Sequence, residues 1–250
     1  MTAAPFRLAV LASGRGSNLQ ALLHAIAAGT LPAQVAGVFS DKPACGAIAI
    51  AREAGLHCVA LKPRDYADRA AHDEALFSAV ADVQPDLIVC AGYLRIITDA
   101  TVRRFEDRMI NLHPSLLPRH PGLDTHARVL AAGETEHGAS VHAVIPALDA
   151  GPVLAQVRLD VGRDDTPASL AGRLAPRRGD AAAFDPEAET LPLEFFEPMV
   201  RRVMEKPLAS MYAKVTEQAA ILRDHRSPPS AQTGRILQHG DRRVVEMKIQ

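Results

Sequence analysis

The sequence contains few cysteines, and their pattern excludes two kinds of stabilising site. Cys45, Cys58 and Cys90 are the three cysteines among 250 residues, and no two of them have CxxC spacing. An odd number without that spacing argues against a disulfide framework and against a zinc site built from thiolates. Small buried thiols in the reducing cytoplasm account for them better.

The chain also lacks a surplus of charge and long apolar runs. Its 28 Lys and Arg residues face 29 Asp and Glu residues, which gives a net charge of −1. This balance gives no indication of binding to nucleic acid or to a membrane, so any anion site must be local. The longest apolar runs, such as 87–91, are far below the roughly 20 residues of a membrane span. We expect a soluble cytoplasmic protein.

The first two thirds of the chain alternate short β-rich runs with helical patterns. We expect strands at 7–11, 35–39, 57–61, 86–91, 109–111, 139–145 and 153–161. Helical spacing of apolar residues occurs at 19–26 and 75–83, Gly29 and Gly55 are expected helix stops, and Pro167 begins an expected helix that reaches Leu174. This alternation predicts an α/β fold, an open, mostly parallel twisted sheet flanked by helices.

Beyond Pro176 the composition changes. Residues 177–190 are polar and rich in alanine, residues 208–222 keep helical spacing, and residues 227–230 form a Ser-Pro-Pro-Ser linker. We therefore predict one domain over 1–175 and a divergent, partly helical tail of uncertain structure over 176–250.

A glycine-rich loop separates the first expected strand from the first expected helix. Gly14, Gly16, Ser17 and Asn18 lie in this loop. Free N–H groups and the positive end of a helix attract phosphate, and glycine lets the backbone approach the anion. Ser17 and Asn18 add side-chain donors, and either could cap the helix. The loop favours a phosphate site, although a tight turn without a ligand has the same pattern.

The same loop has features of a dinucleotide-binding site, because Asp41 follows the second expected strand where a ribose-binding acid would lie. The third glycine of that motif is missing, since Leu19 stands in its place. Leu19 belongs to the apolar stripe of the helix, so this alternative is less favoured.

Polar residues end the strand expected at 109–111. Asn111 and His113 are two residues apart, and Pro114 favours an extended His113, so both side chains should project from one face. The amide can donate to an oxygen that becomes negative as a carbonyl is attacked, and the imidazolium can protonate a leaving nitrogen. Asp149 lies in a later turn; placed beside His113, its charge would raise the imidazole pKa and keep the acid form available. Structural roles for His113, His142 and Asp149 remain open on spacing alone.

Six segments together resemble the phosphoribosylglycinamide formyltransferase family. They read SGRGSNLQ (13–20), AGYLRI (91–96), INLHPSLLP (110–118), PGLDTH (121–126), EHGASVH (136–142) and DAGP (149–152). The resemblance spans about residues 6–175 with the segments in order and at compatible spacing, so it is far more specific than any single motif. It implies a formyltransferase-like, Rossmann-type catalytic domain over 1–175.

The resemblance also implies a reaction and a set of site residues. The reaction is transfer of a formyl group from 10-formyltetrahydrofolate, as co-substrate, to the amine of phosphoribosylglycinamide in purine synthesis, with no metal. Asn111, His113 and Asp149 match the catalytic residues, with His113 as proton donor, while Gly16, Ser17 and Asn18 match those that hold the substrate phosphate. The folate site would comprise Arg69, Leu94, Arg95, Ile96, Ile97, Asn111, Ile145, Pro146, Ala147, Leu148 and Asp149.

The match ends near Ala175. The family carries a glutamate-histidine pair that helps to hold the ribonucleotide, whereas this chain has Arg177, Arg178, Gly179 and Asp180 there. Arg178 could attract phosphate, but it cannot replace a carboxylate as an acceptor. A catalytically impaired folate-binding paralogue therefore stays open.

Two related enzymes offer further alternatives. A hydrolase of 10-formyltetrahydrofolate could use the same Asn-His-Asp arrangement, but it would need no phosphate loop and usually carries an additional N-terminal domain. A formyltransferase acting on initiator methionyl-tRNA would need a further C-terminal domain and a basic surplus, which this sequence lacks.

Overall fold

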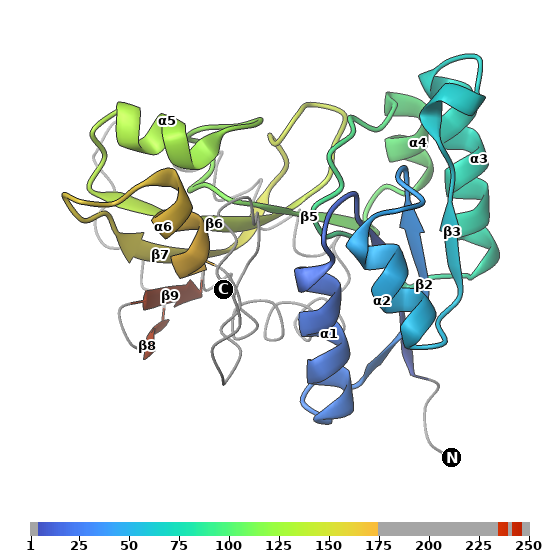
Figure 1. Cartoon of the computed structure of the whole chain (residues 1–250), viewed down its shortest axis with the longest axis horizontal. Helices are drawn as coiled ribbons and strands as arrows, with labels where there is room; N and C mark the ends of the chain where they lie inside the picture. The colour runs from blue at the N-terminus through green and yellow to red at the C-terminus, as the bar shows by residue number, and fades with distance from the viewer. Residues whose placement is uncertain (1–4, 175–234, 240–241, 247–250) are drawn as a thin grey trace, which may run out of the picture.

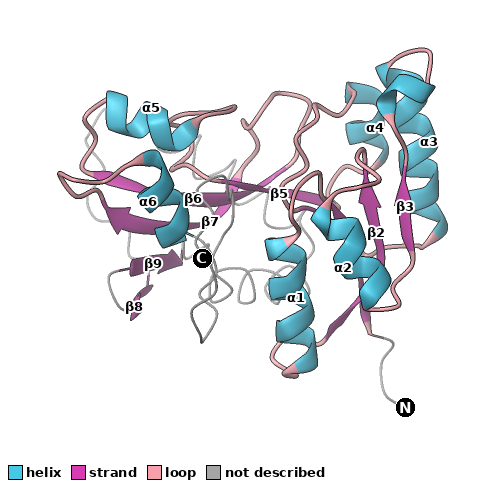
Figure 2. Ribbon diagram, viewed as in Figure 1, coloured by secondary structure: helices cyan, strands magenta, loops and turns pink. Residues whose placement is uncertain are grey.

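The computed structural model describes residues 5–174, 235–239 and 242–246. In the first half of the chain the elements are β1 (Phe6–Leu11), α1 (Ser17–Ala27), β2 (Ala33–Ser40), α2 (Gly46–Glu53), β3 (Cys58–Ala60), the 3-10 turn η1 (Pro63–Asp65), α3 (Arg69–Asp82), β4 (Leu87–Cys90), α4 (Asp99–Arg104) and β5 (Met109–His113). They are followed by α5 (Thr125–Ala131), β6 (Glu136–Ala143), β7 (Val153–Asp160), α6 (Pro167–Leu174), β8 (Arg235–His239) and β9 (Arg242–Glu246). Figure 1 shows these elements in chain order, and Figure 2 shows the strands forming a sheet flanked by helices.

The strands form one sheet in the order β3-β2-β1-β4-β5-β6-β7-β9-β8. The five strands from β3 to β5 are parallel, and β6, β7, β9 and β8 each pair antiparallel with the neighbour before them in this order. The predicted open, mostly parallel α/β sheet is confirmed for the strands β1 to β7. Because β6 runs antiparallel to β5, Ala143 at the end of β6 pairs with Ile110 near the start of β5, and the turn that follows β6 begins there.

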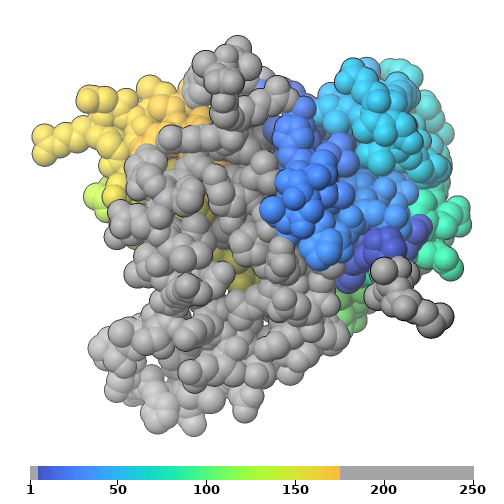
Figure 3. Space-filling view, turned by 90° about the horizontal axis from the view of Figure 1, so that it is seen from below, coloured from blue at the N-terminus to red at the C-terminus, as the bar shows by residue number. Residues whose placement is uncertain are grey.

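Alternation along β1 explains the two layers of helices. Leu8 and Val10 pack in a buried cluster with apolar residues of α1, α2 and α6. Ala9 and Leu11 point to the other face, where they pack with α3 and with Phe105 at the end of α4. Because a parallel sheet is covered on both faces, its central strands are apolar at every position rather than at every second one. In a space-filling view from below, the N-terminal residues, drawn from blue to cyan, form one continuous part of the surface (Figure 3).

The expected strands and long helices are present, with ends that differ by at most three residues except at the start of α3, which begins six residues before the expected stripe. Gly29 and Gly55 follow the last residues of α1 and α2 and adopt positive φ, as expected of helix stops. The short helices α4 and α5 and the strands β8 and β9 were not anticipated. The helix expected at 208–222 and the linker at 227–230 lie outside the described residues. Within the described residues no helix is long and apolar enough to cross a membrane.

Three parallel strands bring the predicted site segments to one edge of the sheet. The glycine-rich loop follows β1, residues 92–98 follow β4, and Asn111 and His113 lie at the end of β5. The order β1-β4-β5 makes these segments neighbours. Ligands of open α/β sheets bind at this carboxyl edge, so the fold places the candidate residues where a site is expected.

Candidate functional site

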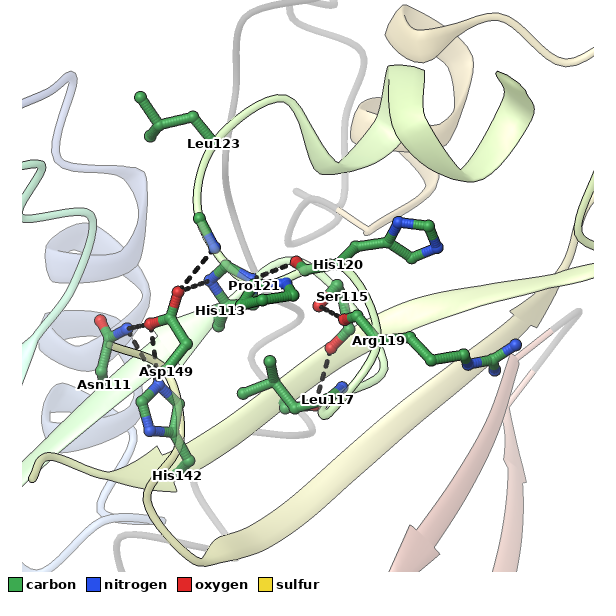
Figure 4. Close-up of polar contacts among 12 residues, drawn as sticks. Asn111, His113, Ser115, Leu117, Arg119, His120, Pro121, Leu123, His142 and Asp149 are labelled. Atoms are coloured by element: carbon green, nitrogen blue, oxygen red, sulfur yellow. Dashed lines mark hydrogen bonds and ion pairs between the residues drawn. The ribbon is translucent and has the colours of Figure 1, made fainter. Parts of the chain in front are cut away.

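Asn111 and His113 project from one face of β5, as expected for residues two positions apart on a strand. His113 is buried and Asn111 is half-buried. Both line a single cavity of about 260 Å³. Figure 4 shows the two side chains with Asp149 lying between them.

Asp149 reaches these residues from the turn after β6. One of its carboxylate oxygens, Oδ2, accepts a hydrogen bond from the Gly122 N–H at 2.8 Å and lies 3.5 Å from His113 Nδ1. The other, Oδ1, accepts from Asn111 Nδ2 at 3.5 Å. The fold therefore brings together three residues that are separated by up to 38 positions in the sequence.

His142 is a fourth member of the cluster, and the sequence alone had left open whether its role is structural. Its Nδ1 lies 2.9 Å from the Ala143 carbonyl oxygen, which can only accept, so Nδ1 carries the proton. When the ring is neutral, Nε2 is then an acceptor, and Asn111 Nδ2 donates to it at 3.1 Å. This contact turns the Asn111 amide nitrogen toward His142 and Asp149. The signal that could have found it is strand register, because β6 places His142 directly opposite Asn111.

The loop between β5 and α5 closes over His113. His113 Nε2 lies 2.9 Å from the His120 carbonyl oxygen, so Nε2 carries a proton and donates it. The Ser115 hydroxyl donates to the Arg119 carbonyl oxygen at 2.7 Å, which fixes the loop at a second point. Since Nε2 is committed to the loop, Nδ1 is the nitrogen that faces the Asp149 carboxylate (Figure 4).

Burial lowers the pKa of His113 below its ordinary value, and the His120 carbonyl and the Asp149 charge oppose this effect without reversing it. Burial raises the pKa of Asp149, but its contacts with His142, the Gly122 N–H and His113 outweigh burial and hold that pKa below its ordinary value. Asp149 does raise the His113 pKa, as expected from the sequence. The net direction is nevertheless opposite to the expectation, so His113 is mainly neutral and Asp149 ionised near pH 7.

Most residues predicted for a folate site line the cavity of about 260 Å³. Those present in its wall are Leu94, Arg95, Ile96, Ile97, Asn111, Ile145, Pro146, Leu148 and Asp149. Ala147 and Arg69 are not part of the wall; Arg69 is instead the exposed first residue of α3. Sequence reasoning missed other lining residues, including Leu123.

The cavity has an unusually apolar rim. Leu94, Ile96, Leu123 and Leu148 are the large hydrophobic side chains that stand out as exposed in the described residues, with 49–64% of their surface accessible, and all four line this cavity. Exposed apolar groups gathered around a few polar residues are typical of a binding site for a small organic ligand.

The glycine-rich loop lies directly beside this cavity. Ser13 N–H donates to the Gly92 carbonyl oxygen at 2.8 Å, and the Ser13 hydroxyl accepts from Leu94 N–H at 3.0 Å; Gly92 and Leu94 both line the cavity. Asp41 accepts from the Ser13 hydroxyl at 2.6 Å and is only 6% exposed. Because a ribose-binding acid must be presented to its ligand, this arrangement counts against the dinucleotide alternative.

Gly16 is the N-cap of α1, so the expectation that Ser17 or Asn18 caps the helix is wrong. Gly16 has φ +83°, and the helix has no side-chain cap hydrogen bond. A Cβ at this position would lie 2.6 Å from Ala47 Cα, which leaves no room for a side chain. Ser17 and Asn18 are the first two residues of the helix, where backbone N–H groups have no partner within the helix. The predicted phosphate residues therefore lie together at a helix N-terminus.

Comparison with known proteins agrees with this geometry. The sequence profile described as formyl transferase matches residues 6–182. The chain belongs to this family. Phosphoribosylglycinamide formyltransferase of Escherichia coli (strain K12) is 39% identical over 167 residues, which cover 67% of this chain and 79% of that protein. The enzyme of the same name from Mycobacterium tuberculosis is 43% identical over 171 residues, with 68% and 79% covered.

Solved structures of the formyl transferase family give the same result for the fold. The phosphoribosylglycinamide formyltransferase of Coxiella burnetii aligns with a TM-score of 0.65 at 41% identity, covering 68% of this chain and 80% of that one. These matches span the described first two thirds of the chain, which contains the cavity and the glycine-rich loop. The family's glutamate-histidine position, occupied here by Arg177 and Arg178, falls outside the described residues.

Proposed function

We propose that this protein transfers the formyl group of 10-formyltetrahydrofolate to the amine of 5-phosphoribosylglycinamide in de novo purine biosynthesis. The observation that carries the proposal is the convergence of Asn111, His113 and Asp149 in the wall of one apolar-rimmed cavity beside a glycine-rich helix N-terminus. Both substrates are small molecules, and the location inferred from the cysteine pattern is the cytoplasm.

The apolar cavity and the glycine-rich loop each bind one of the two substrates. The flat pterin and aminobenzoyl rings of the folate suit the apolar cavity, whose rim includes Leu94 and Leu148. The phosphate of the ribonucleotide suits the loop at Gly16, Ser17 and Asn18, where the helix N-terminus supplies donors and positive potential. Each substrate then reaches the polar end of β5 from a different side.

The chemistry needs no covalent intermediate with the protein. The amine attacks the formyl carbon directly, the carbonyl oxygen becomes negative, and the bond from carbon to the folate nitrogen then breaks. Positioning two substrates in register contributes much of the rate of such a reaction. The Asn111 amide can donate to the negative oxygen; its contact with Asp149 is long, 3.5 Å, so the N–H on that side is the one available to a ligand.

Proton balance assigns a role to His113. The attacking amine must lose a proton and the leaving folate nitrogen must gain one. Because burial keeps His113 mainly neutral, the ring can accept the first proton and then act as the donor to the leaving nitrogen. Asp149 lies 3.5 Å from Nδ1 and stabilises the imidazolium that forms between these steps. None of these steps calls for a metal ion.

The test mixes the purified protein with 10-formyltetrahydrofolate, with and without the ribonucleotide amine, and follows release of the deformylated folate. Product that depends on the amine supports the proposal. Product that forms equally without the amine would establish a hydrolase, and folate binding without turnover would establish an inactive paralogue.

Two variants test whether the activity depends on the site that contains Asn111. Loss of one oxyanion donor costs about 3 kcal/mol, so Asn111→Ala should lower kcat about a hundredfold or more with an unchanged circular dichroism spectrum. Glu53→Ala, at an exposed position on α2 away from the cavity, is the control and should keep its rate. A near-normal rate for Asn111→Ala would remove this residue from the mechanism.

A further inference from the structure

The loop of residues 114–122, between β5 and α5, makes two of the contacts that hold the cluster around Asp149. The His120 carbonyl oxygen accepts from His113 Nε2 at 2.9 Å, and the Gly122 N–H donates to Asp149 at 2.8 Å. The His120 carbonyl points to His113, whereas the His120 ring points away from it (Figure 4). Any group that fixes the backbone at residue 120 therefore also fixes the partner of His113 Nε2.

His120 has a backbone conformation that carries a cost. Its φ is +52°, in the left-handed region, where a Cβ lies too close to the following carbonyl oxygen. Such a conformation persists only where the surroundings hold it. The side chains of Ser115 and Arg128 hold the carbonyl groups of its two neighbours, Arg119 and Pro121. Both contacts act on neighbouring peptide groups, so the contacts of the His120 side chain decide whether residue 120 keeps its conformation.

Glu134 holds the side chains of two consecutive loop residues. Its Oε2 accepts from Arg119 Nη1 at 2.6 Å, and its Oε1 lies 2.6 Å from His120 Nε2, which donates because an ionised carboxylate only accepts. The backbone of Glu134 is fixed after the end of α5, where its N–H donates to the Val129 carbonyl oxygen at 3.2 Å. The side chains of His120 and Glu134 are 13% and 19% exposed, so solvent screens this pair less than a pair on the open surface.

Two acceptors compete for the single proton of the neutral His113 ring. The His120 carbonyl oxygen lies 2.9 Å from Nε2, and the Asp149 carboxylate lies 3.5 Å from Nδ1. The nearer carbonyl keeps the proton on Nε2, which leaves Nδ1 as the base. If residue 120 relaxed out of the left-handed region, its carbonyl would turn away and the Asp149 carboxylate would draw the proton to Nδ1. The ring would then have no base on the side that faces Asp149.

We propose that Glu134 is a positioning residue for the reaction. By holding the His120 side chain, it keeps the His120 carbonyl on His113 Nε2 and so selects the tautomer with a basic Nδ1. This inference rests on the proposed function, in which that nitrogen takes a proton from the attacking amine. Glu134 is not part of the wall of the folate cavity, so it acts through His120 and not by contact with that substrate.

The first measurement is the nitrogen NMR spectrum of the full chain with isotope-labelled histidine, at pH 7.5 and without substrates. The protonated and unprotonated nitrogens of a neutral imidazole give separate signals, and His113→Asn identifies those of His113. The parent protein should carry the proton on Nε2. In Glu134→Ala we expect the form with the proton on Nδ1 to prevail. An unchanged His113 spectrum in this variant would overturn the proposal, whatever the activity of the protein.

The second measurement is the steady-state rate of formyl transfer for variants whose circular dichroism spectra match that of the parent. Glu134→Ala should lower kcat about tenfold, the factor expected when a left-handed residue is free to relax. The KM for the ribonucleotide should stay within about twofold, because the phosphate loop at Gly16 is untouched. A loss confined to KM would overturn the proposal.

His120→Gly tests whether Glu134 acts through residue 120. Glycine adopts positive φ without strain and keeps the carbonyl group, so this variant should lower kcat only about threefold. Adding Glu134→Ala to His120→Gly should then change kcat by about twofold or less, because the contact between the two side chains is already lost. A tenfold loss from Glu134→Ala in both backgrounds would show that Glu134 acts by another route and would overturn the assignment.

Glu74→Ala is the matched control. The Glu74 carboxylate also accepts from two side chains, those of Arg104 and Ser78, but it lies on α3, outside the loop and the cavity wall. This variant should keep the kcat and the His113 spectrum of the parent; the changes expected of Glu134→Ala, if found here too, would overturn the proposal. Absence of amine-dependent turnover in the parent would instead contradict the proposed function, and the NMR spectrum would still decide whether Glu134 sets the tautomer of His113.

Discussion

Acidification should destabilise this protein well above the pH at which carboxylates titrate, because of one pair of histidines, His126 and His137, of which His137 is buried and His126 half-buried. His126 Nδ1 lies 2.7 Å from His137 Nε2, and their rings meet edge to face. Burial lowers the pKa of His126 to about 4, and burial together with the charge of His126 lowers the pKa of His137 to about 3. One proton can lie between the two facing nitrogens. Protonation of both rings would set two N–H groups against each other.

The sign and size of the effect follow from linkage. Both folded values lie below the ordinary histidine pKa of about 6.5, so the unfolded chain takes up protons first. The stability contributed by the neutral pair is complete above about pH 6.5 and is lost as the pH falls toward the folded values of about 4 and 3. At pH 5.5, one unit below the unfolded pKa, each histidine has lost roughly 1.4 kcal/mol, or about 3 kcal/mol for the pair.

Urea unfolding followed by circular dichroism at pH 7.5 and pH 5.5 measures this loss. The variant His126→Asn/His137→Gln keeps a donor and an acceptor near the two facing nitrogens but cannot titrate, so it should lose roughly 3 kcal/mol less than the parent between these pH values. The buried His113, whose pKa is also lowered, is present in both proteins and cancels in the comparison. Equal losses in parent and variant would refute the assignment of the pH dependence to this pair.

Three substitutions test other parts of the structure. Gly16→Ala places a side chain on a residue with left-handed backbone, in contact with α2. We expect the free energy of unfolding to fall by about 2–4 kcal/mol and the KM for the ribonucleotide to rise roughly tenfold or more. Gly14 has open space around it, so Gly14→Ala should change neither quantity by much. Asp149→Asn removes a charge that raises the His113 pKa and stabilises its imidazolium, so kcat should fall about a hundredfold. Because His113 must be neutral to accept the first proton, the acid limb of the pH profile should move to lower pH; an unmoved limb would separate Asp149 from His113. Gly138→Ala would drive a Cβ into the carbonyl oxygen of Val157 on β7, and we expect a melting temperature several degrees lower; an unchanged value would show that the two strands separate without cost.

The parts of the fold that could be predicted are those with a regular apolar pattern. β1 and β4 have apolar residues on both faces, and α1 and α3 are long enough to show a repeat of helical period. α4 and α5 have only six and seven residues, which is too short for such a repeat. β8 and β9 lie in a part of the tail where no alternation was recognised.

The candidate site likewise has features that could be predicted from the sequence and features that could not. Asn111 and His113 could be paired from their spacing, because the geometry of one strand decides which face they share. The contact of His142 with Asn111 depends on register between two strands, and the lowered pKa of His113 depends on burial by a loop whose path no local pattern encodes. Arg69 was placed at the folate site by resemblance, whereas the structure puts it outside the cavity wall, at the start of α3.

The position of β4 between β1 and β5 sets a distance that substrates must match. Neighbouring strands lie about 4.8 Å apart, so the loop after β1 and the polar end of β5 are separated by two such steps, roughly 10 Å. A molecule anchored by its phosphate in the loop can present to Asn111 only an amine that its own framework carries across that gap. The strand spacing thereby selects substrates by length. A shorter phosphorylated amine would bind through its phosphate in the loop, but its amine would not reach the formyl carbon.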